Sequence, residues 1–293
     1  MSTADALHRP AVVGARRVAL LLLGAAGVWS FATLDLALAD LVPSSGGLEA
    51  AQRFFSRALS PALHSEARLA SAAAPPVVVT AMAAAWTTLV YAAAAMSLSL
   101  VLGIALGFGT SSALWLDEPA DSGRGAGSSG ALAPLLYAAG RVLIALMRSI
   151  HELLWAVLLL VAVGLNELAA VLALAIPHAG ILAKVFSELI DEAPRDASRA
   201  LRDAGASKLQ IYCFALLPRA LPDLVTYAFY RFECMLRSSA VLGLFGFPTL
   251  GLYIRQSFAS TNYGEVWTYL YALLALVLAF EAWSGAVRRR LQA

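Results

Sequence analysis

Long apolar segments divide this chain, and they constrain its fold more than any other feature of the sequence. About 20 consecutive apolar residues cross the hydrocarbon core of a bilayer as one helix. Of the 293 residues, 60% are hydrophobic and only 14% are charged, whereas about a quarter of the residues of a soluble domain are charged. The sequence therefore predicts an all-α integral membrane protein with about six transmembrane helices. Their predicted positions are Val18–Val42, Val77–Gly109, Ala131–Leu165, Glu167–Phe186, Leu221–Phe245 and Tyr263–Val287.

The third apolar segment is too long for a single straight span. As one helix, residues 131–165 would extend about 50 Å, against a hydrocarbon core about 30 Å thick. Arg148 and Glu152 interrupt this segment near its middle. We expect the helix to break or kink there, or else to begin well outside the bilayer.

Basic residues predict the orientation of the chain, because Lys and Arg accumulate in cytoplasmic loops. The segments predicted inside hold 12 Lys and Arg residues, and those predicted outside hold 4. Both termini are therefore expected in the cytoplasm. The inside segments are 1–17, 111–130, 189–219 and 288–293, and the outside segments are 43–76, 164–166 and 247–262.

Residues 1–76 are predicted to form an anchor helix followed by an extracytoplasmic segment. The alternative is a secretory signal, since basic residues, an apolar run and the small residues Ala37-Leu38-Ala39 imitate one with its cleavage site. The apolar run is longer than a usual signal core and contains Trp29 and Phe31. An uncleaved helix is therefore the favoured interpretation.

Catalytic and metal-binding motifs are not found in the sequence. The two cysteines, Cys213 and Cys234, have no metal-site spacing, and the four histidines form no HxxxH pair. Gly125–Gly130 superficially resembles a phosphate-binding loop, but Ala131-Leu132 stands where Lys-Ser/Thr should follow. We interpret it as a linker and expect no enzyme activity, cofactor, metal or nucleic acid. An integral membrane enzyme remains a remote alternative, although the acids near the cytoplasmic side alternate with arginines instead of clustering.

A charged stretch, residues 195–222, interrupts the apolar segments. Gly205 is expected to end a first short helix in a left-handed conformation, and Ser207 to cap a second one closed by Pro218. The first helix carries a stripe of small and apolar residues, which would either dock on another protein or lie on lipid headgroups. The stripe consists of Ala197, Ala200, Leu201 and Ala204.

This stretch resembles the cytoplasmic coupling loop of bacterial ABC-importer permeases. Gly205 and Leu217-Pro218 stand in the register of that loop, with Ala200 as its first alanine. The segments "RSIHELLWAVLLLVAVGL", "ALAIPHAGILAKVFSELIDE" and "YRFECMLRSSAVLGLFG" narrow the resemblance to the phosphonate-type permeases. Arg199 departs from the pattern, because the family loop has glutamate there.

The resemblance implies a type I importer permease with a methionine-importer-like fold over residues 77–293 and a coupling loop at about 190–219. It would lie in the bacterial inner membrane as a multi-pass subunit. Its expected partners are a cytoplasmic ABC ATPase dimer that binds ATP and Mg²⁺, a second permease subunit and an extracytoplasmic solute-binding protein. The second subunit would be an identical copy or a paralogue. Phosphonate or a related phosphorus oxyanion is the expected substrate, with phosphate, phosphite or methionine as alternatives. The expected ATPase-coupling residues are Ala197, Ala200, Leu201, Ala204, Gly205, Leu217 and Pro218.

Charged residues within spans are costly and mark functional sites. Arg148 with Glu152, and Glu233 with Arg237, stand four residues apart, so each pair could stabilise the packing of one helix. Alternatively, the two arginines line a route that favours an anion. Gly243, Gly246 and Gly251, around the end of the fifth span, permit a tight re-entrant turn or close helix contact, which we expect at an outer gate. The candidate translocation residues are Arg148, Glu152, Glu233, Arg237, Gly243 and Gly246.

Overall fold

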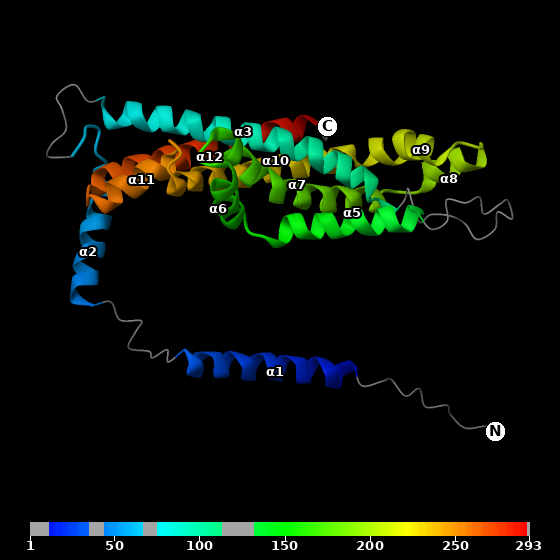
Figure 1. Cartoon of the computed structure of the whole chain (residues 1–293), viewed down its shortest axis with the longest axis horizontal. Helices are drawn as coiled ribbons and strands as arrows, with labels where there is room; N and C mark the ends of the chain where they lie inside the picture. Colours follow the sequence, from blue (N-terminus) through cyan, green and yellow to red (C-terminus); the bar gives the residue numbers. More distant parts are fainter. Residues whose placement is uncertain (1–11, 35–43, 67–74, 113–131, 292–293) are drawn as a thin grey trace. The chain divides into compact units, whose positions relative to one another are not determined.

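The computed structural model describes residues 12–34, 44–66, 75–112 and 132–291, and within these ranges every regular element is helical (Figure 1). The first two helices are α1 (Val12–Thr33) and α2 (Ser45–Ser56). They belong to a compact unit, Met1–Ser56, that is separate from a second unit, Arg57–Ala293. The second unit contains α3 (Val77–Gly109), α5 (Leu132–Ser149), α6 (Glu152–Val163), α7 (Glu167–Glu192), α8 (Asp196–Asp203), α9 (Lys208–Ile211), the π-helical turn η2 (Tyr212–Leu216), α10 (Leu217–Val241), the 3₁₀ turn η3 (Leu242–Phe245), α11 (Leu250–Ala259) and α12 (Tyr263–Leu291).

Three of the described helices, α3, α7 and α12, are long and apolar enough to cross a membrane. Two bent pairs, α5 with α6 and Lys208–Phe245 with α11, raise the number to five if each pair is one span. The all-α membrane fold is confirmed. Length and composition support three to five spans rather than about six, because the described apolar part of α1, Arg17–Thr33, is short. The predicted domain boundary after residue 76 stays a prediction.

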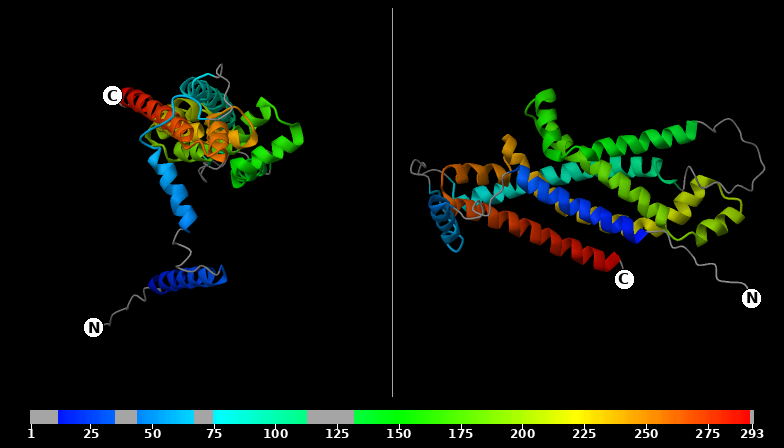
Figure 2. Two further views of the ribbon diagram at one scale, coloured as in Figure 1. Left: turned by 90° about the vertical axis from the view of Figure 1, so that its left-hand side faces the viewer. Right: turned by 90° about the horizontal axis from the view of Figure 1, so that it is seen from below.

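The third apolar segment breaks where the sequence predicts a break. Helix α5 ends at Ser149 and α6 begins at Glu152, and their axes differ by 93° (Figure 2). His151 caps the new helix, since its Nδ1 accepts a hydrogen bond from the backbone nitrogen of Leu153 at 3.3 Å. A side chain that caps a helix start satisfies a backbone donor left free by the break.

Small residues hold α3 and α7 together at the centre of the second unit. A Cβ atom on Gly103 would lie 2.7 Å from the Leu182 Cβ, and one on Gly107 would lie 3.1 Å from the Ala183 oxygen. The Ser99 hydroxyl also donates to the Ala175 carbonyl at 3.1 Å. Close backbone approach and hydroxyl hydrogen bonds are the usual means of helix association in membranes.

Helix α10 joins this pair through buried hydroxyl groups. Ser239 Oγ donates to the Thr88 carbonyl at 3.0 Å, and Thr88 Oγ1 accepts from the backbone nitrogen of Leu250 at 3.1 Å. One residue of α3 therefore positions both the last turns of α10 and the start of α11.

The buried carboxylate of Glu265 links three segments at the α11 end of the unit. It accepts hydrogen bonds from Ser65 Oγ (3.0 Å), the Glu66 backbone nitrogen (2.7 Å) and Ser257 Oγ (2.8 Å). These donors come from the segment before α3 and from α11, while Glu265 itself lies in the first turn of α12. Ser65 and Glu66, just before α3, are thereby tied to α12. At the opposite end of the unit lie α8 and α9 (Figure 1).

Candidate functional site

The turn between α8 and α9 has the predicted geometry. Gly205 has φ +83°, the left-handed conformation in which glycine is favoured. The Ala206 nitrogen donates to the Leu201 carbonyl at 3.0 Å, and the Gly205 nitrogen donates to the Arg202 carbonyl at 2.9 Å. This pair of bonds is the Schellman arrangement that ends helices at a glycine. The prediction for Gly205 is confirmed.

Ser207 caps the second helix, as predicted. Its hydroxyl accepts from the Gln210 nitrogen, and the Gln210 side chain accepts in turn from the Ser207 nitrogen, which completes a capping box. The predicted stop at Pro218 is wrong. The chain continues from α9 through the π turn into α10, with Pro218 in the first turn of α10. A wider turn before a proline relieves the clash of its ring with the preceding helix.

The predicted docking stripe on α8 divides into two parts. Ala200 and Ala204 are exposed, whereas Ala197 and Leu201 are half-buried. Ser198 on the same helix is buried, so α8 turns that face toward its own chain. Ala200 and Ala204 therefore offer a surface of small residues, as a close docking contact requires. Leu217 is half-buried and Pro218 is exposed at the start of α10.

Hydrogen bonds tie the base of this loop to two long helices. Asp191, near the end of α7, accepts from Ser111 Oγ at 2.6 Å and from the Ser112 nitrogen at 3.0 Å, just beyond α3. Arg219 of α10 donates to the Pro194 carbonyl at 3.3 Å and lies 3.9 Å from Asp196 of α8. A displacement of α8 would therefore reach α10 through Asp196 and Arg219, and would reach α7 and α3 through the connecting chain and the bonds of Asp191.

The predicted pair of Arg148 and Glu152 does not share a helix. The break at 149–152 separates them, and Arg148 is exposed at the end of α5. Glu152 instead accepts a hydrogen bond from Ser238 Oγ of α10 at 2.5 Å. The carboxylate therefore joins the bent segment to α10, a contact that spacing along the sequence does not reveal.

The second predicted pair shares α10, yet no ion pair joins Glu233 to Arg237 among the described residues. Arg237 is exposed and donates to Cys234 Sγ at 3.6 Å. Arg237 lines a groove together with Arg255 of α11. Arg255 lies in the segment 247–262, which the sequence predicts to be outside the membrane. It is the one basic residue between positions 247 and 262, and that isolation was the available signal.

Glycines shape the turn between α10 and α11. A Cβ atom on Gly243 would overlap the backbone nitrogen of Leu252, and one on Gly251 would overlap the Ala240 oxygen. Gly246 has φ +100° and ends η3. The tight turn and the close helix contact are both present. The assignment of Gly243 and Gly246 to an outer gate stays a prediction.

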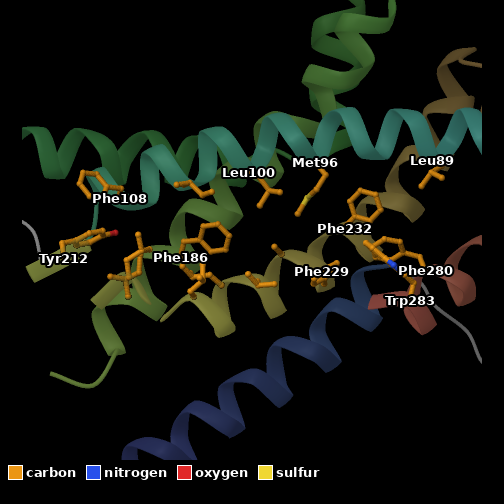
Figure 3. A pocket seen from close by; sticks show the side chains of 17 residues that line it. Leu89, Met96, Leu100, Phe108, Phe186, Tyr212, Phe229, Phe232, Phe280 and Trp283 are labelled. Atoms are coloured by element: carbon orange, nitrogen blue, oxygen red, sulfur yellow. The ribbon is translucent and has the colours of Figure 1, made fainter. Parts of the chain in front are cut away.

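A larger groove of about 740 Å³ runs between α3, α7, α10 and α12 (Figure 3). Phe108 and Tyr212 lie toward one end of it, and Phe232, Phe280 and Trp283 toward the other. Its other lining residues are apolar too. An anion would lose its hydration there without gaining a charged partner, so this groove does not provide a route for one.

Known proteins are similar in sequence to the second half of this chain. The family model described as "Binding-protein-dependent transport system inner membrane component" matches residues 124–293. The phosphite transport system permease protein PtxC of Stutzerimonas stutzeri is 37% identical over 159 residues, which cover 53% of this chain and 57% of PtxC. The phosphate-import permease protein PhnE of Mycolicibacterium smegmatis is 32% identical over 158 residues, which cover 54% of this chain and 30% of PhnE. The chain thus spans little more than half of PtxC and less than a third of PhnE.

The fold is also similar to a solved transporter structure. A chain of the MetNI methionine ABC transporter, in an inward-facing conformation, aligns with a TM-score of 0.60 and 25% identity. The alignment covers 72% of this chain and 96% of that one. The predicted methionine-importer-like fold is confirmed.

Proposed function

The chain belongs to the binding-protein-dependent transport system inner membrane components, which confirms the family predicted from its sequence, and we propose that it forms the membrane-spanning permease of an ATP-driven importer for a small phosphorus oxyanion. The observation that supports this most strongly is the loop α8–Gly205–α9, whose exposed Ala200 and Ala204 lie at the family's coupling position. PtxC and PhnE are named as phosphite and phosphate permeases, which favours a phosphorus oxyanion as the substrate.

In this proposal the loop is the contact through which an ATPase dimer drives the permease. ATP and Mg²⁺ are bound by that dimer, and this chain hydrolyses nothing itself. A binding protein delivers the solute to the outer face, and a second permease subunit completes the pore. The two subunits then alternate between inward- and outward-facing states by rigid-body motion. Both termini lie in the cytoplasm.

A second candidate substrate is methionine, because the MetNI chain shares the fold along nearly its whole length. The two candidates differ in charge. Methionine is a zwitterion at neutral pH, whereas phosphite, phosphate and methylphosphonate are anions. An uptake assay with these four solutes therefore separates them.

The test is uptake by the complex in proteoliposomes, assembled with its cognate ATPase and binding protein. ATP-dependent accumulation of at least one phosphorus oxyanion, and none of methionine, is expected. Ala200→Glu and Ala204→Glu place a charge on the docking surface, so they should abolish uptake and release the ATPase at normal permease abundance. Asp203→Ala, which changes a neighbouring exposed residue to a small one, is the matched control. Accumulation of methionine alone would exclude the proposed substrate. Full ATPase association in both glutamate variants would exclude the coupling role.

A further inference from the structure

A groove of about 450 Å³ lies where the last turns of α10 meet α11 and α12. Cavities of roughly 300–1,000 Å³ hold small molecules in proteins. Two of the residues that line it are arginines, one on α10 and one on α11, and the others are apolar or glycine. The two arginines are Arg237 and Arg255.

Neither arginine has an acidic partner within the part of the chain that the structure describes. Both are exposed, and the contact of Arg237 to Cys234 Sγ neutralises no charge. Glu265, at the start of the neighbouring α12, already accepts three hydrogen bonds from Ser65, Glu66 and Ser257. Two positive charges therefore border one small apolar groove without a carboxylate among its lining residues.

The separation of the two arginines is held by the backbone. Gly243 and Gly251 let α11 lie directly against the end of α10, where any side chain would overlap the facing backbone. Thr249 Oγ1 also donates to the Ala240 carbonyl at 2.9 Å. A site whose helices are already in place spends no free energy on arranging them when it binds a ligand.

Guanidinium groups suit phosphorus oxyanions because their planar N–H donors match two oxygens at once. Apolar surroundings strengthen this attraction by lowering the local dielectric constant. Unpaired charges in membrane segments are costly and characteristically mark ligand or ion sites. We infer that Arg237 and Arg255 together form a binding site for a phosphorus oxyanion at the α11 end of the permease.

Two sources can supply this chemistry, namely the carried solute and the headgroup of an anionic phospholipid. The first source rests on the proposed function, and the second does not. In both cases Arg255, which lies outside the helix that carries Arg237, is a determinant of anion recognition.

The experiment uses the complete complex with Arg237→Gln, Arg255→Gln and Arg255→Lys. Arg53→Gln is the matched control, because it removes an exposed arginine that is also predicted to lie outside. The first arm measures the maximal ATP-dependent uptake of phosphite, inorganic phosphate and methylphosphonate with saturating loaded binding protein. The second arm measures phosphatidylglycerol retained by the complex, using native mass spectrometry.

If the solute is the ligand, each glutamine variant lowers maximal uptake about tenfold or more, the loss expected for hydrogen bonds to a charged group. Arg255→Lys keeps the charge and loses the paired donors, so it falls between the wild type and Arg255→Gln. Retained phosphatidylglycerol does not change. If the headgroup is the ligand, the glutamine variants lose bound phosphatidylglycerol and keep their uptake.

Unchanged uptake together with unchanged lipid in both glutamine variants would overturn the inference. Loss of assembly in both Arg255→Gln and Arg255→Lys would overturn it as well, since Arg255 would then serve packing. The proposed function fails separately, if the wild-type complex accumulates none of the three anions. The lipid arm still decides the site in that case.

Discussion

At the scale of single residues, Gly205 has the strictest requirement in the coupling loop. Its φ of +83° lies in the left-handed region, and a Cβ atom built there would meet no atom within 4 Å. Space around the residue is therefore sufficient, and the backbone conformation alone demands glycine. This distinguishes Gly205 from Gly243, where the facing backbone leaves no room.

Gly205→Val is expected to reorient the loop, because a β-branched residue at positive φ costs about 1–3 kcal/mol. Gly205→Asn is the matched control, since asparagine tolerates the left-handed conformation. The measurement is the fraction of ATPase that co-purifies with a tagged permease. The valine variant should lose most of it and the asparagine variant should keep most of it. Equal retention by both variants would show that the turn does not set the docking geometry.

At the scale of elements, the proposed coupling loop would act through the helices to which its base is bonded. The Asp191 carboxylate holds the end of α3 through Ser111 Oγ and the Ser112 nitrogen. Ser111 is fully buried. The bond between its hydroxyl and a carboxylate is therefore shielded from competing water.

Ser111→Ala is expected to lower the stability of the permease by about 1–3 kcal/mol, the typical loss for a hydrogen bond to a charged group. Ser112→Ala is the control, because Ser112 contacts Asp191 through its backbone nitrogen, which the substitution leaves in place. Thermal unfolding of the purified complex measures the first effect. The ratio of solute transported to ATP hydrolysed should also fall in Ser111→Ala alone. If the two variants had the same stability and the same ratio of solute transported to ATP hydrolysed, the hydrogen bond between Ser111 and Asp191 would have no part in coupling.

Local rules account for the elements that the sequence predicted correctly. The break near Arg148–Glu152, the left-handed Gly205 and the Ser207 cap each depend on residues within a few positions of one another. One local prediction failed, because Pro218 stands in the first turn of α10 instead of closing a helix. The other failures concern contacts between distant segments. Glu152 accepts a hydrogen bond from Ser238 on another helix, 86 positions away, and Arg237 lines the same groove as Arg255. Periodicity and spacing contain no information about which helices become neighbours.

At the scale of the whole molecule, the two ends of the second unit should lie on opposite sides of the membrane. Ser207 caps α9, whereas Ser65 bonds to Glu265 at the start of α12. Reporter fusions after Ser207 should therefore report a cytoplasmic position, and fusions after Ser65 an extracytoplasmic one. A fusion after Gly125, which lies outside the described residues, should also be cytoplasmic by its basic-residue count. Finding Ser65 and Ser207 on the same side would refute this orientation.

The interlocked small residues of α3 and α7 have a mechanical consequence. Helix α7 has 26 residues and is thus about 39 Å long. Gly103 and Gly107 let α3 approach it closely over about one turn, around Leu182 and Ala183. This close contact keeps the two helices together around Leu182, so a displacement at Asp191 should move them as a pair even though Pro177 interrupts the backbone hydrogen bonding of α7. We expect the chain to bend instead at two connections between helices. One is the break between Ser149 and Glu152, and the other is the turn through Gly246. In a transport cycle, these two positions would serve as hinges. The α3–α7 pair would rotate about them as one body.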